Sequence, residues 1–117
     1  MAWTLTVRRA GRVERERFSE LESVLDAIES RVRMLTDAAP QRPVDLRYKT
    51  LEAVQQVFAR LELSGPERFM PSIRAGIDIR GDGSAEPYLG SLRRRPIDQR
   101  SGESAAAALR RVLLESD

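Results

Sequence analysis

Cysteine and histidine are both absent from this chain of 117 residues. Without cysteine there are no disulfides, no thiolate nucleophiles and no cysteine-ligated zinc or iron–sulfur sites. Without histidine there is no Ser-His-Asp chemistry, and the side chain that normally titrates near neutral pH is missing. The remaining residue types favour binding over catalysis, so we expect a protein that is not an enzyme and that has no cofactor and no metal site.

Lysine and long apolar segments are also scarce. Lys49 is the single lysine among 20 basic residues, and the other bases are arginines, which stay protonated in proteins. The net charge is only +2, so the composition as a whole does not call for a polyanionic partner. No apolar run approaches the roughly 20 residues that span a bilayer, and the N-terminus lacks a signal-peptide pattern. We expect one cytoplasmic domain over residues 1–117, with no membrane contact.

Alternating apolar and polar residues at the N-terminus predict a β-hairpin over residues 3–17. The tripeptide Arg9-Ala10-Gly11 suits a three-residue loop with Gly11 in the left-handed region. That loop would place Arg15 opposite Leu5 and Arg17 opposite Trp3, so two arginines would extend the apolar face.

We interpret these inward charges as protection of an edge strand against aggregation. The alternative is an anion site formed by Arg15 and Arg17.

The next element is predicted to be an amphipathic helix. Ser19-Glu20-Leu21-Glu22 has the spacing of a capping box, and Pro40 should follow the end of the helix near residues 37–39. Apolar residues recur behind this start at three- and four-residue steps. They are Leu21, Val24, Leu25, Ile28, Val32 and Leu35.

Four further segments carry strand patterns. Residues 50–56 fit either a helix or a strand, and we choose a strand for residues 55–63 because β-branched and aromatic residues cluster there. The expected strands are 44–48, 55–63, 73–80 and 86–95, with a Gly/Asp-rich turn at 81–84. A final helix should begin after Ser101-Gly102-Glu103-Ser104, with an apolar face of Ala105, Ala108, Leu109, Val112 and Leu113.

This order predicts an α+β fold, a two-layer sandwich in which two helices cover one face of an antiparallel sheet of about five strands. The order would be β-β-α-β-β-β-β-α or β-β-α-β-β-β-α. The other sheet face would be polar, with Phe58, Arg60, Glu62, Arg74, Asp78 and Arg80.

The densest basic stretch lies near the C-terminus and suggests a nucleic-acid or phosphate surface. Its members are Arg93, Arg94, Arg95, Arg100, Arg110 and Arg111. The helix–strands–helix order is also similar in topology to double-stranded-RNA-binding domains. Phosphate bridging in that family would require bases at the start of the last helix, where residues 101–105 offer one acid and no base.

Carboxylates gather around the Gly-rich turn, where Asp78, Asp82 and Glu86 could face a hard cation. The adjacent Arg80 opposes a cation, and a turn-forming role explains Asp82 better.

From these patterns we expect a small non-catalytic interaction module, a homodimer or a protein-binding domain, that uses its sheet face or edge. The alternative is an RNA-binding module that uses the arginines of residues 93–111. A carboxylate-dependent enzyme would require two acids in one polar cleft.

Overall fold

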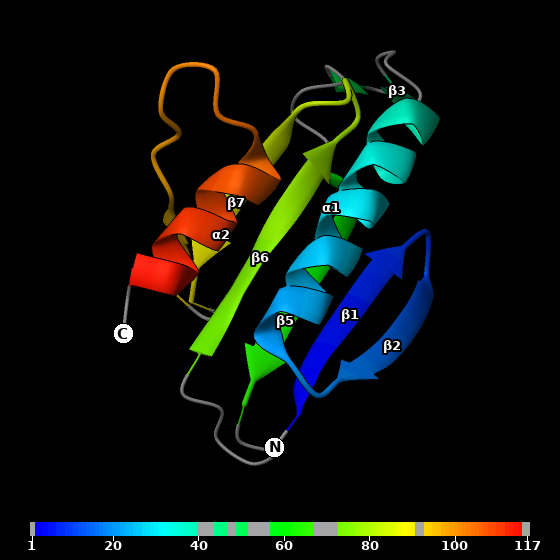
Figure 1. The fold of residues 1–117 in the computed structure, drawn as a ribbon. Helices are drawn as coiled ribbons and strands as arrows, with labels where there is room; N and C mark the ends of the chain where they lie inside the picture. The colour runs from blue at the N-terminus through cyan, green and yellow to red at the C-terminus, as the bar shows by residue number, and fades with distance from the viewer. Residues whose placement is uncertain are drawn as a thin grey trace.

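The computed structural model describes residues 2–39, 44–46, 49–51, 57–66, 73–90 and 93–115. An antiparallel sheet of six strands has the order β2-β1-β5-β6-β7-β8, and β3 and β4 pair separately (Figure 1). The strands are β1 (Trp3–Arg9), β2 (Arg12–Phe18), β3 (Val44–Leu46), β4 (Lys49–Leu51), β5 (Val57–Gly65), β6 (Ile73–Arg80), β7 (Ala85–Leu89) and β8 (Arg95–Pro96). The predicted α+β class is confirmed.

The helices α1 (Leu21–Ala38) and α2 (Ala105–Glu115) lie side by side on one face of the sheet (Figure 1). The apolar positions of both helices meet the inward residues of the central strands, as their periodicity predicts. The largest fully buried side chains are Leu5, Val24, Ile28, Leu61, Leu63, Ile77, Ile79 and Leu109. Of residues 50–56, which fit either a helix or a strand, residues 50–51 belong to the strand β4, and residues 52–56 lie outside the described ranges. Residues 57–63 form a strand as expected.

Helix α1 ends at Ala38 as predicted, but its predicted capping box is absent. The N-cap residue is Glu20, and no side chain caps the helix. The carboxylate of Glu22 instead accepts a hydrogen bond from Arg110 of α2. The local pattern predicts that Glu22 accepts a hydrogen bond from the N-terminus of its own helix, but Glu22 binds the guanidinium of Arg110 on the second helix instead.

Helix α2 begins where the sequence predicts. The Ser104 hydroxyl accepts a hydrogen bond from the Ala107 amide at 3.1 Å, which caps the first turn. Ala105 and Ala108 are buried, and these small side chains allow the helix backbone to approach the sheet closely. Figure 1 shows α2 over β6 and β7, beside α1.

The hairpin between β1 and β2 differs by one residue from the predicted register. Arg9 pairs with Arg12, so the loop contains only Ala10 and Gly11, with φ of +49° and +79°. Positive φ at both central residues is the signature of a tight turn that matches the twist of paired strands. The prediction failed because it required a left-handed conformation at Gly11 alone, whereas Ala10 adopts one too.

The shift by one residue exchanges the two faces of β2, because strand side chains alternate. Phe18 now lies opposite Trp3, and Glu16 opposite Leu5. Arg15 and Arg17 lie opposite Thr6 and Thr4, on the sheet face away from the helices. They are therefore not inward charges, and the interpretation that depended on that placement is wrong.

The strand predicted for residues 86–95 is interrupted. β7 ends at Leu89, and Gly90, at φ +92°, donates its amide to the Arg74 carbonyl. The two-residue strand β8 follows and pairs antiparallel with β7.

Candidate functional site

Three cross-strand rows of side chains cover the sheet face that is turned away from the helices, which we call the open face. The first row is Val13, Arg8, Arg60, Asp78 and Glu86; the second is Arg15, Thr6, Glu62, Gly76, Tyr88 and Pro96; the third is Arg17, Thr4, Ser64 and Arg74. The first two rows contain all the acids of this face, and the third row contains only arginines and hydroxyls.

The centre of the open face is an ion pair. Arg60 donates two hydrogen bonds to Asp78, at 2.7 and 3.2 Å, and Asp78 is only 8% exposed. The hydrogen bonding to Asp78 raises the pKa of Arg60 above its ordinary value. Two parallel bonds between planar groups fix both side chains, so this pair is a structural element.

Two other arginines of the open face are also paired. Arg8 donates to Glu62 at 3.1 Å, and Arg80 donates to Glu86 at 2.8 Å. Both pairs are more exposed than the central one, so water screens them and each contributes little to stability.

Tyr88 lies in the second row of the open face, between Gly76 and Pro96. Its ring lies against Gly76 on the neighbouring strand, and a Cβ at position 76 would overlap the Tyr88 ring and the Leu61 carbonyl oxygen. The guanidinium of Arg94 lies 5.2 Å from the centre of the same ring. Burial, and then the charge of Asp78, raise the pKa of the Tyr88 hydroxyl to about 12. Tyr88 is 6% exposed, so its ring is not available for stacking with a ligand.

Three arginines of the open face have no carboxylate partner among the described residues: Arg15, Arg17 and Arg74. Arg17 and Arg74 stand at the two ends of the third row, with Thr4 and Ser64 between them. Arg15 occupies the next row on β2. The open face therefore has one part with paired charges and one part with arginines that lack a carboxylate partner among the described residues. We call Arg15, Arg17 and Arg74 together the free arginine row.

The arginines expected to form a phosphate surface do not gather at one place. Arg110 donates to Glu22 and Asp26 and so joins α2 to α1. Burial lowers the pKa of Arg110, but these two hydrogen bonds outweigh burial and raise it overall. Arg93 lies just before β8 and Arg95 is its first residue, and both are exposed, whereas Arg94 lies against the Tyr88 ring.

Arg111 belongs to a second paired group. It donates to both oxygens of Glu103, at 2.8 and 3.0 Å, and to the Asp98 carbonyl. Glu103 also accepts the Arg100 amide, and these hydrogen bonds, that of Arg111 first, lower the pKa of Glu103 to about 2. This arrangement fastens the loop before α2 to the helix.

The carboxylates around the Gly-rich turn point to separate partners. Asp82 accepts the Ser84 hydroxyl and amide, at 2.6 and 2.9 Å, and these bonds lower its pKa. Asp78 and Glu86 are in the ion pairs of the open face. Within the described ranges, no group of three or more acidic side chains is placed to hold a metal ion.

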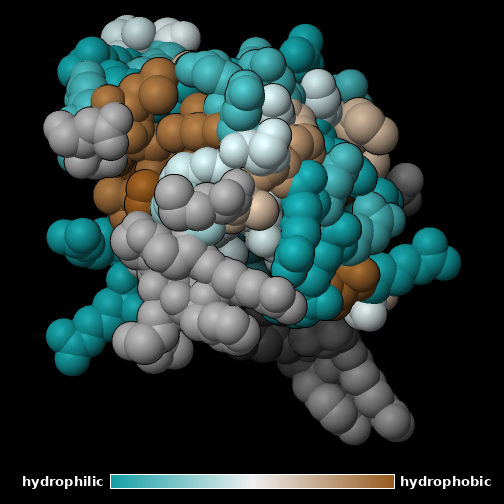
Figure 2. Space-filling view, turned by 60° about the horizontal axis from the view of Figure 1, so that its bottom comes forward, coloured by the Kyte–Doolittle hydropathy of each residue, from teal (hydrophilic) through white to brown (hydrophobic). Residues whose placement is uncertain are grey.

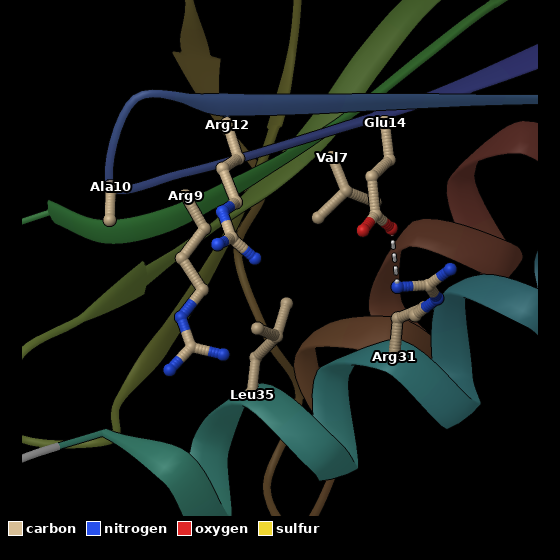
Figure 3. Close-up of a pocket in the computed structure, with 7 residues that line it drawn as sticks. All are labelled: Val7, Arg9, Ala10, Arg12, Glu14, Arg31 and Leu35. Carbon is tan, nitrogen blue, oxygen red and sulfur yellow. Dashed lines mark hydrogen bonds and ion pairs between the residues drawn. The ribbon is translucent and has the colours of Figure 1, made fainter.

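A pocket of about 520 Å³ lies on the other side of the sheet, between the β1–β2 hairpin and α1 (Figure 3). Val7 and Leu35, both buried, supply its apolar part. Arg9 and Arg12 extend from the hairpin toward α1, and Arg31 extends from α1 to Glu14, with a 3.1 Å hydrogen bond. We call this the hairpin–helix pocket.

This pocket was not predicted from the sequence, because it depends on the hairpin register. The predicted loop turned Arg12 and Glu14 away from the helix, whereas the two-residue turn brings them over it. The one local signal was the length of the turn, and Ala10 in the left-handed region is uncommon enough that the sequence did not suggest it.

The most exposed large apolar side chains do not belong to one element. Val13, Met34, Val57 and Leu114 come from four different elements. Figure 2, which brings the lower end of the molecule in Figure 1 forward, shows one hydrophobic area at the upper left, bordered by hydrophilic surface. Single exposed apolar residues are normal on a protein surface, so the charged surfaces are the better candidates for a function.

Neither described helix is long and apolar enough to cross a membrane. Comparison with known proteins assigns no relative: no family model, no curated protein and no solved structure matches this chain.

Proposed function

We propose that this protein is a small non-catalytic interaction module that binds an acidic partner protein through the free arginine row of its open face. The observation that carries the proposal is the contrast within that face. Arg8, Arg60 and Arg80 each have a carboxylate, whereas Arg15, Arg17 and Arg74 have none within the described part of the chain. Unpaired guanidiniums with hydroxyls between them are suited to the carboxylates of another surface.

The edges of the sheet are poor alternatives. β2 is the edge strand on one side, and five of its seven residues are charged. β8 at the other edge has two residues, of which Pro96 lacks an amide hydrogen. Charges, proline and short length are the features that prevent strand addition at an edge, so we place the interface on the face.

A second copy of this chain would fit the open face poorly. The three rows hold five arginines and three acids, and Arg80 beside them brings the net charge of this face to +3. A twofold dimer places the same patch on both subunits, so this face would meet itself with like charge. The homodimer expected from the sequence stays a prediction, and sedimentation or light scattering measures it.

A nucleic acid is the less favoured polyanion. Single strands are bound by stacking on exposed aromatic rings, and Tyr88 and Trp3 are both buried. Arg110 and Arg111 of the predicted basic surface are committed to ion pairs.

The test compares two triple variants of equal charge. Arg15→Gln/Arg17→Gln/Arg74→Gln removes the free arginine row, and Arg93→Gln/Arg95→Gln/Arg100→Gln removes three exposed arginines of the basic stretch. The probes are a fluorescent oligoglutamate peptide and a duplex RNA at low salt, titrated by fluorescence anisotropy. We expect oligoglutamate to bind the wild type and the second variant, and to bind the first variant at least about tenfold more weakly.

Two outcomes would contradict the proposal. Equal losses in both variants would mean that only net charge matters. Tight RNA binding that disappears in the second variant alone would instead support the RNA-binding alternative.

A further inference from the structure

Two arginines stand directly opposite each other at the end of the β1–β2 hairpin. Arg9 and Arg12 are cross-strand partners, and their side chains leave the same face of the sheet. Opposed residues of an antiparallel pair have Cβ atoms about 5 Å apart, and like charges at that position are destabilising. No carboxylate among the described residues pairs with either guanidinium. The hairpin therefore carries an uncompensated double positive charge.

The two guanidiniums have different freedom. Arg9 lies over the ring of Phe58, 4.7 Å from its centre, so the aromatic ring holds its guanidinium in place. Arg12 is exposed and makes no ion pair or ring contact within the described ranges. Arg9 is therefore held in position before a ligand binds, whereas Arg12 can move to contact the ligand.

The surroundings of these cations resemble a ligand site more than a solvated surface. The hairpin–helix pocket has a volume of about 520 Å³, within the range of about 300–1,000 Å³ typical of small-molecule sites. Buried Val7 and Leu35 provide an apolar wall. Figure 3 shows both arginines extending from the hairpin toward α1, with Arg12 above Leu35 and Arg9 beside it.

The charge of the lining indicates the ligand. The pocket contains Arg9, Arg12 and Arg31 but one acid, Glu14, which Arg31 already engages at 3.1 Å. Two positive charges therefore remain. Guanidinium groups bind phosphate through parallel hydrogen bonds, and a phosphate monoester carries close to two negative charges at neutral pH.

We propose that the hairpin–helix pocket binds a small organic phosphate monoester, with the phosphate between Arg9 and Arg12 and a compact apolar group against Val7 and Leu35. A single doubly charged headgroup neutralises both opposed arginines at once. The Arg31–Glu14 pair closes the neighbouring side of the pocket from α1 to β2. This site lies on the helix side of the sheet and is independent of the free arginine row.

The experiment titrates the whole protein with phenyl phosphate, inorganic phosphate and benzyl alcohol, followed by the backbone amide signals in NMR spectra. We expect phenyl phosphate to shift the signals of Gly11 and Leu35. Inorganic phosphate should bind about tenfold more weakly, because it lacks the apolar group, and benzyl alcohol more weakly still.

Variants identify the residues responsible. Arg12→Gln should weaken phenyl phosphate about 10- to 100-fold, since it removes a charged hydrogen-bond donor. Arg33→Gln is the matched control, because Arg33 is an exposed arginine of α1 whose contact with Glu29 is long, at 3.8 Å. It should change the affinity less than about twofold.

Three results would overturn the proposal. Millimolar phenyl phosphate could leave the Gly11 and Leu35 signals unmoved, Arg12→Gln could bind as the wild type does, or Arg33→Gln could lose as much affinity as Arg12→Gln. Loss of oligoglutamate binding in Arg15→Gln/Arg17→Gln/Arg74→Gln, with phenyl phosphate binding unchanged, separates this site from the function proposed above.

Discussion

Two groups of arginines in this molecule have the same chemistry and different surroundings. Arg60, Arg110 and Arg111 each donate two or more hydrogen bonds and hold strands or helices together. Arg12, Arg15, Arg17 and Arg74 project from β2 and β6 with no carboxylate partner in the described ranges. The high arginine content of this protein therefore serves two purposes. The first group stabilises the fold, and the second group is exposed and can contact a ligand.

The largest expected effect follows from breaking the central pair of the open face. Asp78→Ala leaves the Arg60 guanidinium three-quarters buried without its acceptor. Removing one partner of a buried pair costs about 3–5 kcal/mol, and partial exposure of Arg60 reduces this to about 2–3 kcal/mol. Urea unfolding of the variant measures the change in the free energy of unfolding.

Glu62→Ala is the control for Asp78→Ala, since the Arg8–Glu62 pair is more exposed. It should cost less than about 1 kcal/mol. If the two variants were equally stable, Arg60 would not belong with the arginines that stabilise the fold.

The second effect is a dependence of stability on pH that comes from Glu103. Its pKa is about 2 in the folded protein and near the ordinary 4.5 in the unfolded chain. Between those values the unfolded chain binds more protons, so the stabilisation is complete above about pH 5 and is lost as the pH falls toward 2. Urea unfolding at a series of pH values measures this loss.

The variant Glu103→Gln keeps the shape of the side chain and removes the titration. Its stability should be lower than that of the wild type at neutral pH, and the difference should shrink as the medium is acidified. A difference that stayed constant with pH would show that the Arg111–Glu103 pair is not the cause.

A smaller effect is expected where Arg110 joins the two helices. Arg110→Gln removes its hydrogen bonds to Glu22 and Asp26, but both carboxylates are more than half exposed. Water screens such contacts, so the loss should be about 0.5–1 kcal/mol. Thermal unfolding at low and high salt checks this, because added salt should reduce the difference between variant and wild type. A salt-independent loss would point to packing of the side-chain stem.

The smallest effect is expected in the free arginine row. Arg15→Gln/Arg17→Gln/Arg74→Gln removes charges without partners, so the free energy of unfolding should change by less than about 0.5 kcal/mol per site. Circular dichroism during urea unfolding measures it. A large destabilisation would show that these arginines stabilise the fold, and the proposed function would lose its basis.

Much of the fold could be predicted from local patterns. The apolar stripe of α1, the strand over residues 73–80 and the start of α2 after Ser104 depend on neighbours in the sequence, and the structure confirms all three. The predictions that failed involve partners distant in sequence. Glu22 meets Arg110 across 88 positions, and no local signal opposes its role in a capping box.

The sites were less accessible to prediction. The residues Arg15 and Arg17 were identified from the sequence, but on the wrong face, because a loop shorter by one residue inverts every side chain of a strand. The hairpin–helix pocket was missed for the same reason. The sequence does not show which arginines of residues 93–111 are paired. Arg110 and Arg111 are paired because α2 packs on α1 and on the loop before α2.

The sequence by itself determined the α+β class, the polar character of the open face and the absence of thiol and imidazole chemistry. These properties follow from the composition and from the spacing of apolar residues, which repeats every two residues in a strand and every 3.6 residues in a helix and can be recognised within each segment alone. Only the tertiary structure decided the register of the hairpin and the partner of each arginine. A guanidinium is paired or free according to which carboxylate lies within about 4 Å, and that distance depends on segments far apart in the chain.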